Sequence, residues 1–101
     1  MFSSRLQNPQ TDNLARAFLA LENMEDCYRL FEDLFTIREI QDLSQRLEVA
    51  QLLKRQATYT EIVEMTGVST ATIGRVNRAL NYGAGGYQKV LDALAQKDKA
   101  E

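Results

Sequence analysis

The stretch TYTEIVEMTGVSTATIGRVNRAL, residues 58–80, decides the fold of this chain. Its pattern predicts a helix, a tight turn at Thr66-Gly67-Val68 and a second helix at about Ser69–Leu80. Two helices that cross at a steep angle share a small apolar core. The residues with the right spacing for that core are Ile62, Val68, Ile73 and Val76. The stretch therefore predicts a helix-turn-helix within residues 59–80.

The termini of the two helices carry residues that suit those positions. Gly67 tolerates the left-handed backbone conformation that ends a helix, and the hydroxyls of Thr60 and Ser69 are suited to cap the first and second helix. The second helix keeps small polar residues and arginines on its outer face, which suits the major groove of DNA. The candidate DNA-contacting residues are Thr60, Ser69, Thr70, Ala71, Thr72, Gly74, Arg75 and Arg78.

Charge is distributed unevenly along the chain, although its net value is only −2. Residues 65–91 contain Arg75, Arg78 and Lys89 and no acidic residue, a net charge of +3, whereas residues 1–35 carry three Arg against six acids. A basic patch on an acidic body suits binding of a phosphate backbone by one face. An ordinary helical hairpin requires neither the acid-free segment nor the glycine turn.

A second hypothesis remains open. The acidic N-terminal half and the small number of bases are also compatible with a helical interaction module that binds a protein and not DNA. Binding to duplex DNA that weakens with salt separates the two hypotheses.

Composition excludes several classes of function. With 101 residues, 45% of them hydrophobic, the chain fits one globular domain. Cys27 is the single cysteine and histidine is absent, so we expect no disulfide, zinc site or Ser-His-Asp unit. No paired acid/base constellation is visible in the sequence either, so we expect no enzyme and no metal or cofactor. Without a signal peptide or an apolar run near 18 residues, a cytoplasmic protein with no membrane contact is expected.

The N-terminal third predicts two further helices. Residues 1–10 are polar and are predicted to be a flexible arm, which leaves a single helical domain at 11–96. A helix is expected over Thr11–Glu22, capped by Thr11 or Asp12, and another over Met24–Leu34, opened by Asn23. Their apolar and aromatic content exceeds what one small helix-turn-helix covers. We therefore expect some of it to contact a second copy of the chain.

Two more helices flank the helix-turn-helix. Thr36-Ile37-Arg38-Glu39 has the capping-box pattern, and the helix that it starts is expected to run through Gln56 with a broad apolar stripe. After Leu80, three glycines in residues 81–87 predict a sharp turn, followed by a last helix over Tyr87–Ala95 and a frayed end. The chain is thus predicted to be all-α, with about six helices.

The run from Phe35 through Leu94 resembles the Trp repressor superfamily, and in detail its YerC/YecD-like branch. The segments that carry the resemblance are Thr36-Ile37-Arg38-Glu39, Leu43-Ser44-Gln45-Arg46-Leu47, Tyr59-Thr60-Glu61-Ile62, Thr66 through Val76 and Leu80 through Tyr87. The resemblance implies an intertwined homodimer that binds double-stranded DNA and regulates transcription.

The resemblance also implies where an effector would bind. In tryptophan-binding members two arginines sandwich the indole, and they match Arg46 and Arg75. Those members carry glycine directly after the second arginine, where this chain has Val76, whose β-branched side chain adds volume beside a flat pocket. We therefore expect an effector pocket at Arg46, Arg75 and Val76 that does not take tryptophan.

Overall fold

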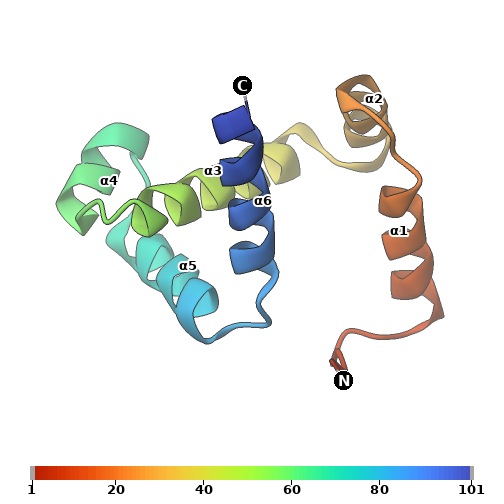
Figure 1. Cartoon of the computed structure of the whole chain (residues 1–101), viewed down its shortest axis with the longest axis horizontal. Helices are drawn as coiled ribbons and strands as arrows, with labels where there is room; N and C mark the ends of the chain where they lie inside the picture. The colour runs from red at the N-terminus through yellow and green to blue at the C-terminus, as the bar shows by residue number, and fades with distance from the viewer. Residues whose placement is uncertain (1, 101) are drawn as a thin grey trace. The chain divides into compact units, whose positions relative to one another are not determined.

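The computed structural model describes residues 2–100, which form helices and no strand. The six helices are α1 (Pro9–Leu19), α2 (Met24–Leu34), α3 (Ile37–Lys54), α4 (Tyr59–Thr66), α5 (Thr70–Tyr82) and α6 (Gly86–Ala100) (Figure 1). The all-α prediction is confirmed. None of these helices combines the length and the apolar character that a membrane span requires.

The chain divides into two compact units, residues 1–37 and residues 38–101, which we describe separately. The first contains α1 and α2, and the second contains α3 to α6.

Helix α1 begins earlier than predicted. Asn8 is its N-cap, because the side-chain oxygen accepts from the N–H of Thr11 at 2.8 Å, and Pro9 occupies the first helical position. Thr11 and Asp12 therefore do not cap it. Asparagine is favoured as an N-cap and proline at the first helical position. These two preferences set the start of the helix, whereas the spacing of the apolar residues suggests a later start. The helix also ends before the predicted Glu22.

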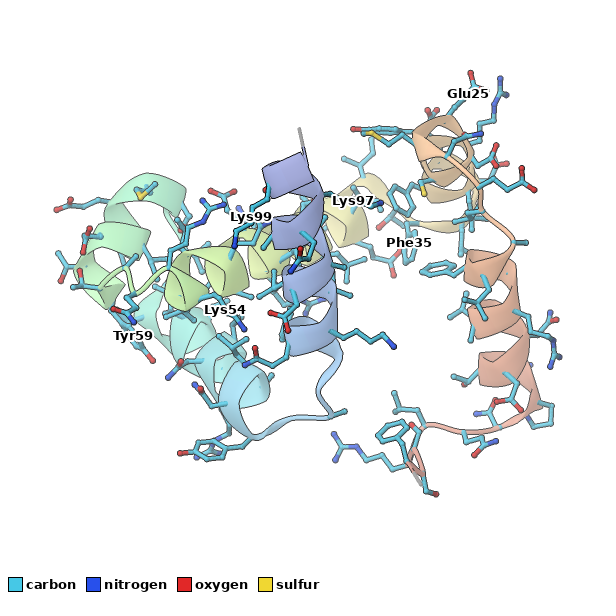
Figure 2. All side chains as sticks on the ribbon, viewed as in Figure 1. Glu25, Phe35, Lys54, Tyr59, Lys97 and Lys99 are labelled. Atoms are coloured by element: carbon cyan, nitrogen blue, oxygen red, sulfur yellow. The ribbon has the colours of Figure 1, made fainter. Side chains whose placement is uncertain are left out.

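Helix α2 has the predicted bounds, and Asn23 caps it by accepting from the N–H of Asp26 at 2.8 Å. Three edge-to-face ring pairs lie in this first unit: Phe18–Phe35, Tyr28–Phe31 and Phe31–Phe35, with centroids 6.1–6.3 Å apart (Phe35 is labelled in Figure 2). Even so, neither α1 nor α2 contains a buried residue. The two helices leave much of their apolar surface uncovered.

The second unit holds the hydrophobic core. Its buried members are Val49, Ala50, Leu52, Ile62, Val68, Ile73, Val76, Leu80 and Leu91. All four residues predicted for the helix-turn-helix core are among them. The stripe on α3 is buried only in its C-terminal half, since Ile37 is 80% exposed and Leu43 is 41% exposed. Burial on α3 thus coincides with the part of the helix that α4, α5 and α6 cover.

Helix α3 ends at Lys54, before the predicted Gln56, through a hydrogen-bond pattern that reverses the chain. Gln56 has a left-handed backbone with φ +68°. Its N–H donates to the carbonyl of Leu53 at 2.9 Å, and the N–H of Ala57 donates to that of Leu52 at 3.0 Å. This pair of bonds is the Schellman motif, in which glycine is the usual left-handed residue. The motif turns the chain from α3 into the helix-turn-helix.

Helix α6 packs back on α3 (Figure 1), and Lys54 on α3 pairs with Asp92 on α6 at 3.4 Å. The prediction that α6 ends at Ala95 and frays from Lys97 is wrong, because the helix continues to Ala100. The last residues include no glycine or proline, and Lys97 and Lys99 interact favourably with the negative end of the helix dipole.

Candidate nucleic-acid interface

The turn between α4 and α5 is fixed by its own backbone and by one threonine. Gly67 has φ +73°, and its N–H donates to the carbonyl of Val63 at 2.9 Å. The hydroxyl of Thr66 donates to the carbonyl of Ile62 at 2.7 Å and accepts from the N–H of Val68 at 3.1 Å. Val68 is then buried in the core, so the turn holds α4 and α5 at a defined angle.

The start of α5 is capped as predicted. The Ser69 hydroxyl accepts from the N–H of Thr72 at 3.2 Å and donates to the Thr72 hydroxyl at 3.1 Å. The guanidinium of Arg75 also donates to that hydroxyl, at 3.4 Å. Thr72 is half-buried, and its hydroxyl lies in this chain of hydrogen bonds. Ser69 and Thr72 therefore shape the beginning of the helix, and Thr70 and Ala71 beside them are exposed.

The cap of α4 is Thr58 and not Thr60. Thr58 and Glu61 form a complete capping box, in which each side chain accepts from the other residue's N–H, at 3.0 and 3.1 Å. The N–H of Thr58 and then its hydroxyl lower the pKa of the Glu61 carboxyl from its ordinary value of 4.5. Thr60 lies in the first turn of α4 and is exposed. The Thr-x-x-Glu spacing in the sequence was the signal for this cap.

Helix α5 has one buried face and one exposed face. Ile73, Val76 and Leu80 are buried. At about 100° per residue, Arg75 and Arg78 lie on the opposite side, and both are exposed. Within residues 2–100 neither arginine has an acidic partner, since the ion pairs formed there join Arg29 to Glu25, Arg38 to Asp42 and Lys54 to Asp92. The exposed face of α5 is thus positively charged and unneutralised.

Gly74 lies inside α5, where glycine costs about 1 kcal/mol relative to alanine. The fold gives no reason for it, because Gly74 does not have a positive φ and an added Cβ would have no atom within 4 Å outside its own helix backbone. Gly83 differs, since its Cβ would lie 2.3 Å from the carbonyl oxygen of Ala79. The fold of the chain therefore requires glycine at position 83 but not at position 74.

A cavity of about 580 Å³ lies beside α5, and the predicted effector residues all line it. The full lining is Asp42, Gln45 and Arg46 from α3, Val68 and Ser69 from the turn, Thr72, Arg75, Val76 and Ala79 from α5, and Tyr87 from α6. Sequence reasoning missed Asp42 and Tyr87, because only the packing of α3 and α6 brings them to this wall. Val76 is 3% exposed and belongs both to this wall and to the core. The cavity combines two guanidinium groups with one carboxylate.

The C-terminal end of α5 is tied to α3 and α6. The amide of Gln88 donates to the carbonyl of Leu80 at 3.2 Å, and the ammonium of Lys54 donates to the amide oxygen of Gln88. Lys54, labelled in Figure 2, also pairs with Asp92. These contacts fix the last turn of α5 before Gly83 ends the helix.

Comparison with known proteins gives a consistent result. The family model described as "Trp repressor protein" matches residues 9–95. The protein YerC of Bacillus subtilis (strain 168), described as uncharacterized, is 48% identical over 94 residues, which cover 93% of this chain and 90% of that protein.

Two solved structures are similar throughout. A TrpR like protein from Eubacterium eligens ATCC 27750 has a TM-score of 0.85 and 48% identity, and the match covers 90% of this chain and 94% of that one. A structure from Staphylococcus aureus also has a TM-score of 0.85, with 47% identity and coverage of 90% and 91%.

Proposed function

Since the chain belongs to the Trp repressor family, in its YerC-like branch, we propose that it is a transcriptional regulator that binds double-stranded DNA in a sequence-specific manner through α5. Members of this family are transcriptional regulators and not enzymes. The observation that carries the proposal is the exposed face of α5, where Arg75 and Arg78 have no acidic partner in the described part of the chain.

The start of α5 supports the same proposal. Thr70 and Ala71 are exposed directly after the Ser69 cap, where a recognition helix enters the major groove. Gly74 then lets the backbone approach DNA closely, which explains a glycine that the fold does not require. Thr60 is exposed in the first turn of α4, where a hydroxyl is suited to a phosphate contact.

We further propose that the regulator is a homodimer. Leu19 and Met24 in the first unit are 85% and 73% exposed, Ile37 at the start of α3 is 80% exposed, and α1 and α2 bury no residue. Apolar surface of this extent requires a partner, and a second copy provides the same surface by symmetry. The two recognition helices would then lie about one DNA turn apart, roughly 34 Å.

Tryptophan is not the proposed effector. Arg46 and Arg75 line one cavity, as a planar ligand would require, but Val76 fills part of its wall and belongs to the core as well. DNA binding is therefore proposed to need no tryptophan. The relatives are bacterial proteins, and a bacterial regulator of this kind acts in the cytoplasm.

The test is DNA binding by Arg75→Ala and Arg78→Ala at several salt concentrations, on a selected operator and on random duplex. Arg78 is expected to contact phosphate, so its removal should weaken binding to both DNAs equally. It should also reduce the slope of log affinity against log salt concentration by about one unit. Arg75 is expected to contact a base edge or to anchor the helix, so its removal should cost roughly 1–3 kcal/mol, mainly on the operator.

Lys97→Ala is the matched control, because it removes an exposed positive charge from the end of α6. If both arginine variants bind both DNAs like the parent, α5 is not the reading element. The interaction-module alternative, which the net charge of −3 in residues 1–35 favours, then takes its place.

Gly74→Ala separates stability from DNA binding. Alanine should stabilise the protein by about 1 kcal/mol through helix propensity, since its Cβ meets open space. The same methyl should weaken DNA binding if the backbone lies against the duplex. A variant that is more stable and binds DNA like the parent would refute the close approach.

A further inference from the structure

Tyr82 ends α5 with an aromatic ring that the fold does not use. The residue is 87% exposed, and none of the exposed large hydrophobic residues within 2–100 exceeds it. Its side chain forms no hydrogen bond or ring contact in that range. The ring is therefore free to contact a partner.

Helical geometry places Tyr82 on the same face as the two arginines of α5. It follows Arg78 by four residues and Arg75 by seven, which corresponds to rotations of roughly 40° and 20° around the helix axis. The buried residues of α5, centred on Leu80, lie on the opposite side. Tyr82 thus extends the positive face of α5 by one turn.

The backbone that carries Tyr82 is held rigidly. Gln88 donates to the carbonyl of Leu80 at 3.2 Å and is itself held by Lys54. Gly83 follows directly, and any side chain there would collide with the carbonyl of Ala79. The helix therefore ends at Tyr82, and the ring projects from a fixed position rather than from a loop.

The length of α5 decides which part of DNA the ring would meet. From Thr70 to Tyr82 the helix rises about 18 Å, whereas the major groove is about 12 Å wide. If α5 crosses the groove with its first turn at the base edges, its last turn would lie beyond those edges and against the sugar-phosphate backbone. Residues 65–91 contain no acidic residue, and the carboxylate of Asp92, which follows them, is paired with Lys54 at 3.4 Å.

We propose that Tyr82 is a DNA-backbone contact, in which its hydroxyl donates to a phosphate oxygen and its ring covers the adjacent sugar. This inference rests on the proposed DNA binding of α5 and adds a neutral anchor beside Arg78. A tyrosine hydroxyl displaces no counterion, so the contact should add affinity without adding salt dependence.

The experiment compares Tyr82→Phe and Tyr82→Ala with the parent on a selected operator and on random duplex at several salt concentrations. Loss of one hydrogen bond should weaken binding about three- to tenfold for Tyr82→Phe, and loss of the ring should weaken it further for Tyr82→Ala. For each variant, the loss of affinity should be the same on the operator as on the random duplex. The slope of log affinity against log salt concentration should not change. Met65→Ala is the control, since it removes a 64% exposed apolar side chain from α4.

The outcomes separate this inference from the proposed function. If Arg78→Ala weakens binding while both Tyr82 variants bind like the parent, the Tyr82 contact is absent and DNA binding by α5 stands. If the parent shows no salt-dependent binding to DNA, both proposals fail. Hydroxyl-radical oxidation of the parent adds a check without mutation: saturating DNA should protect Tyr82 and leave Met65 reactive. Equal oxidation of Tyr82 with and without DNA would overturn the inference.

Discussion

Val76 links the stability of the protein to its proposed indifference to tryptophan. It is 3% exposed, it belongs to the core cluster, and it lines the cavity between Arg46 and Arg75. Val76→Ala removes two buried methyl groups at about 0.8 kcal/mol each, and the space left behind adds to this, so we expect a loss of about 2 kcal/mol. Glycine costs about 1 kcal/mol more in a helix interior, so Val76→Gly should lose about 3 kcal/mol.

Urea unfolding of the parent and the two variants measures these losses, and calorimetry with millimolar tryptophan measures binding. The parent should give no saturable heat. Val76→Gly, with the wall of the cavity removed, should bind tryptophan measurably while still folded. If Val76→Ala is as stable as the parent, Val76 is not a packed core residue. A micromolar dissociation constant for the parent would show that the side chain does not close the pocket.

Three further outcomes are expected. Sedimentation at micromolar protein should give about twice the 11.5 kDa chain mass, and a monomer would remove the dimer proposal. Gln56→Gly should stabilise the protein by about 0.5–1 kcal/mol by relieving the left-handed backbone at φ +68°, whereas Arg55→Gly beside it should not. The capping box lowers the pKa of Glu61 in the folded state, so its contribution to stability is present above pH 4.5 and is lost as pH falls through the lowered value. Glu61→Gln should flatten this part of the stability profile, and an unchanged profile would contradict the assignment.

Local sequence signals predicted helix ends correctly where one residue type is clearly favoured at one backbone position. Gly67 provides the left-handed turn, Ser69 caps α5, and Asn23 caps α2. The errors arose where two local signals competed. Thr58 and Thr60 both lie at the start of α4, and the glutamate three residues after Thr58 makes Thr58 the cap, with Thr60 inside the first turn. At the end of α3, glutamine adopts a conformation for which glycine is the usual signal, so the sequence placed the boundary two residues late.

The sequence by itself determined the number and order of the helices, though not all of their ends, together with the four core residues of the helix-turn-helix and the acid-free segment around α5, because these depend on spacing and on residue type. Only the tertiary structure decided which part of the α3 stripe is buried and which side chains share the cavity. Asp42 and Tyr87 are 45 residues apart in the chain (87 minus 42), and no local pattern connects them. They line one wall because α3 and α6 pack around the same core. Sequence periodicity fixes the face of each helix, whereas the neighbours of that face depend on how separate helices pack.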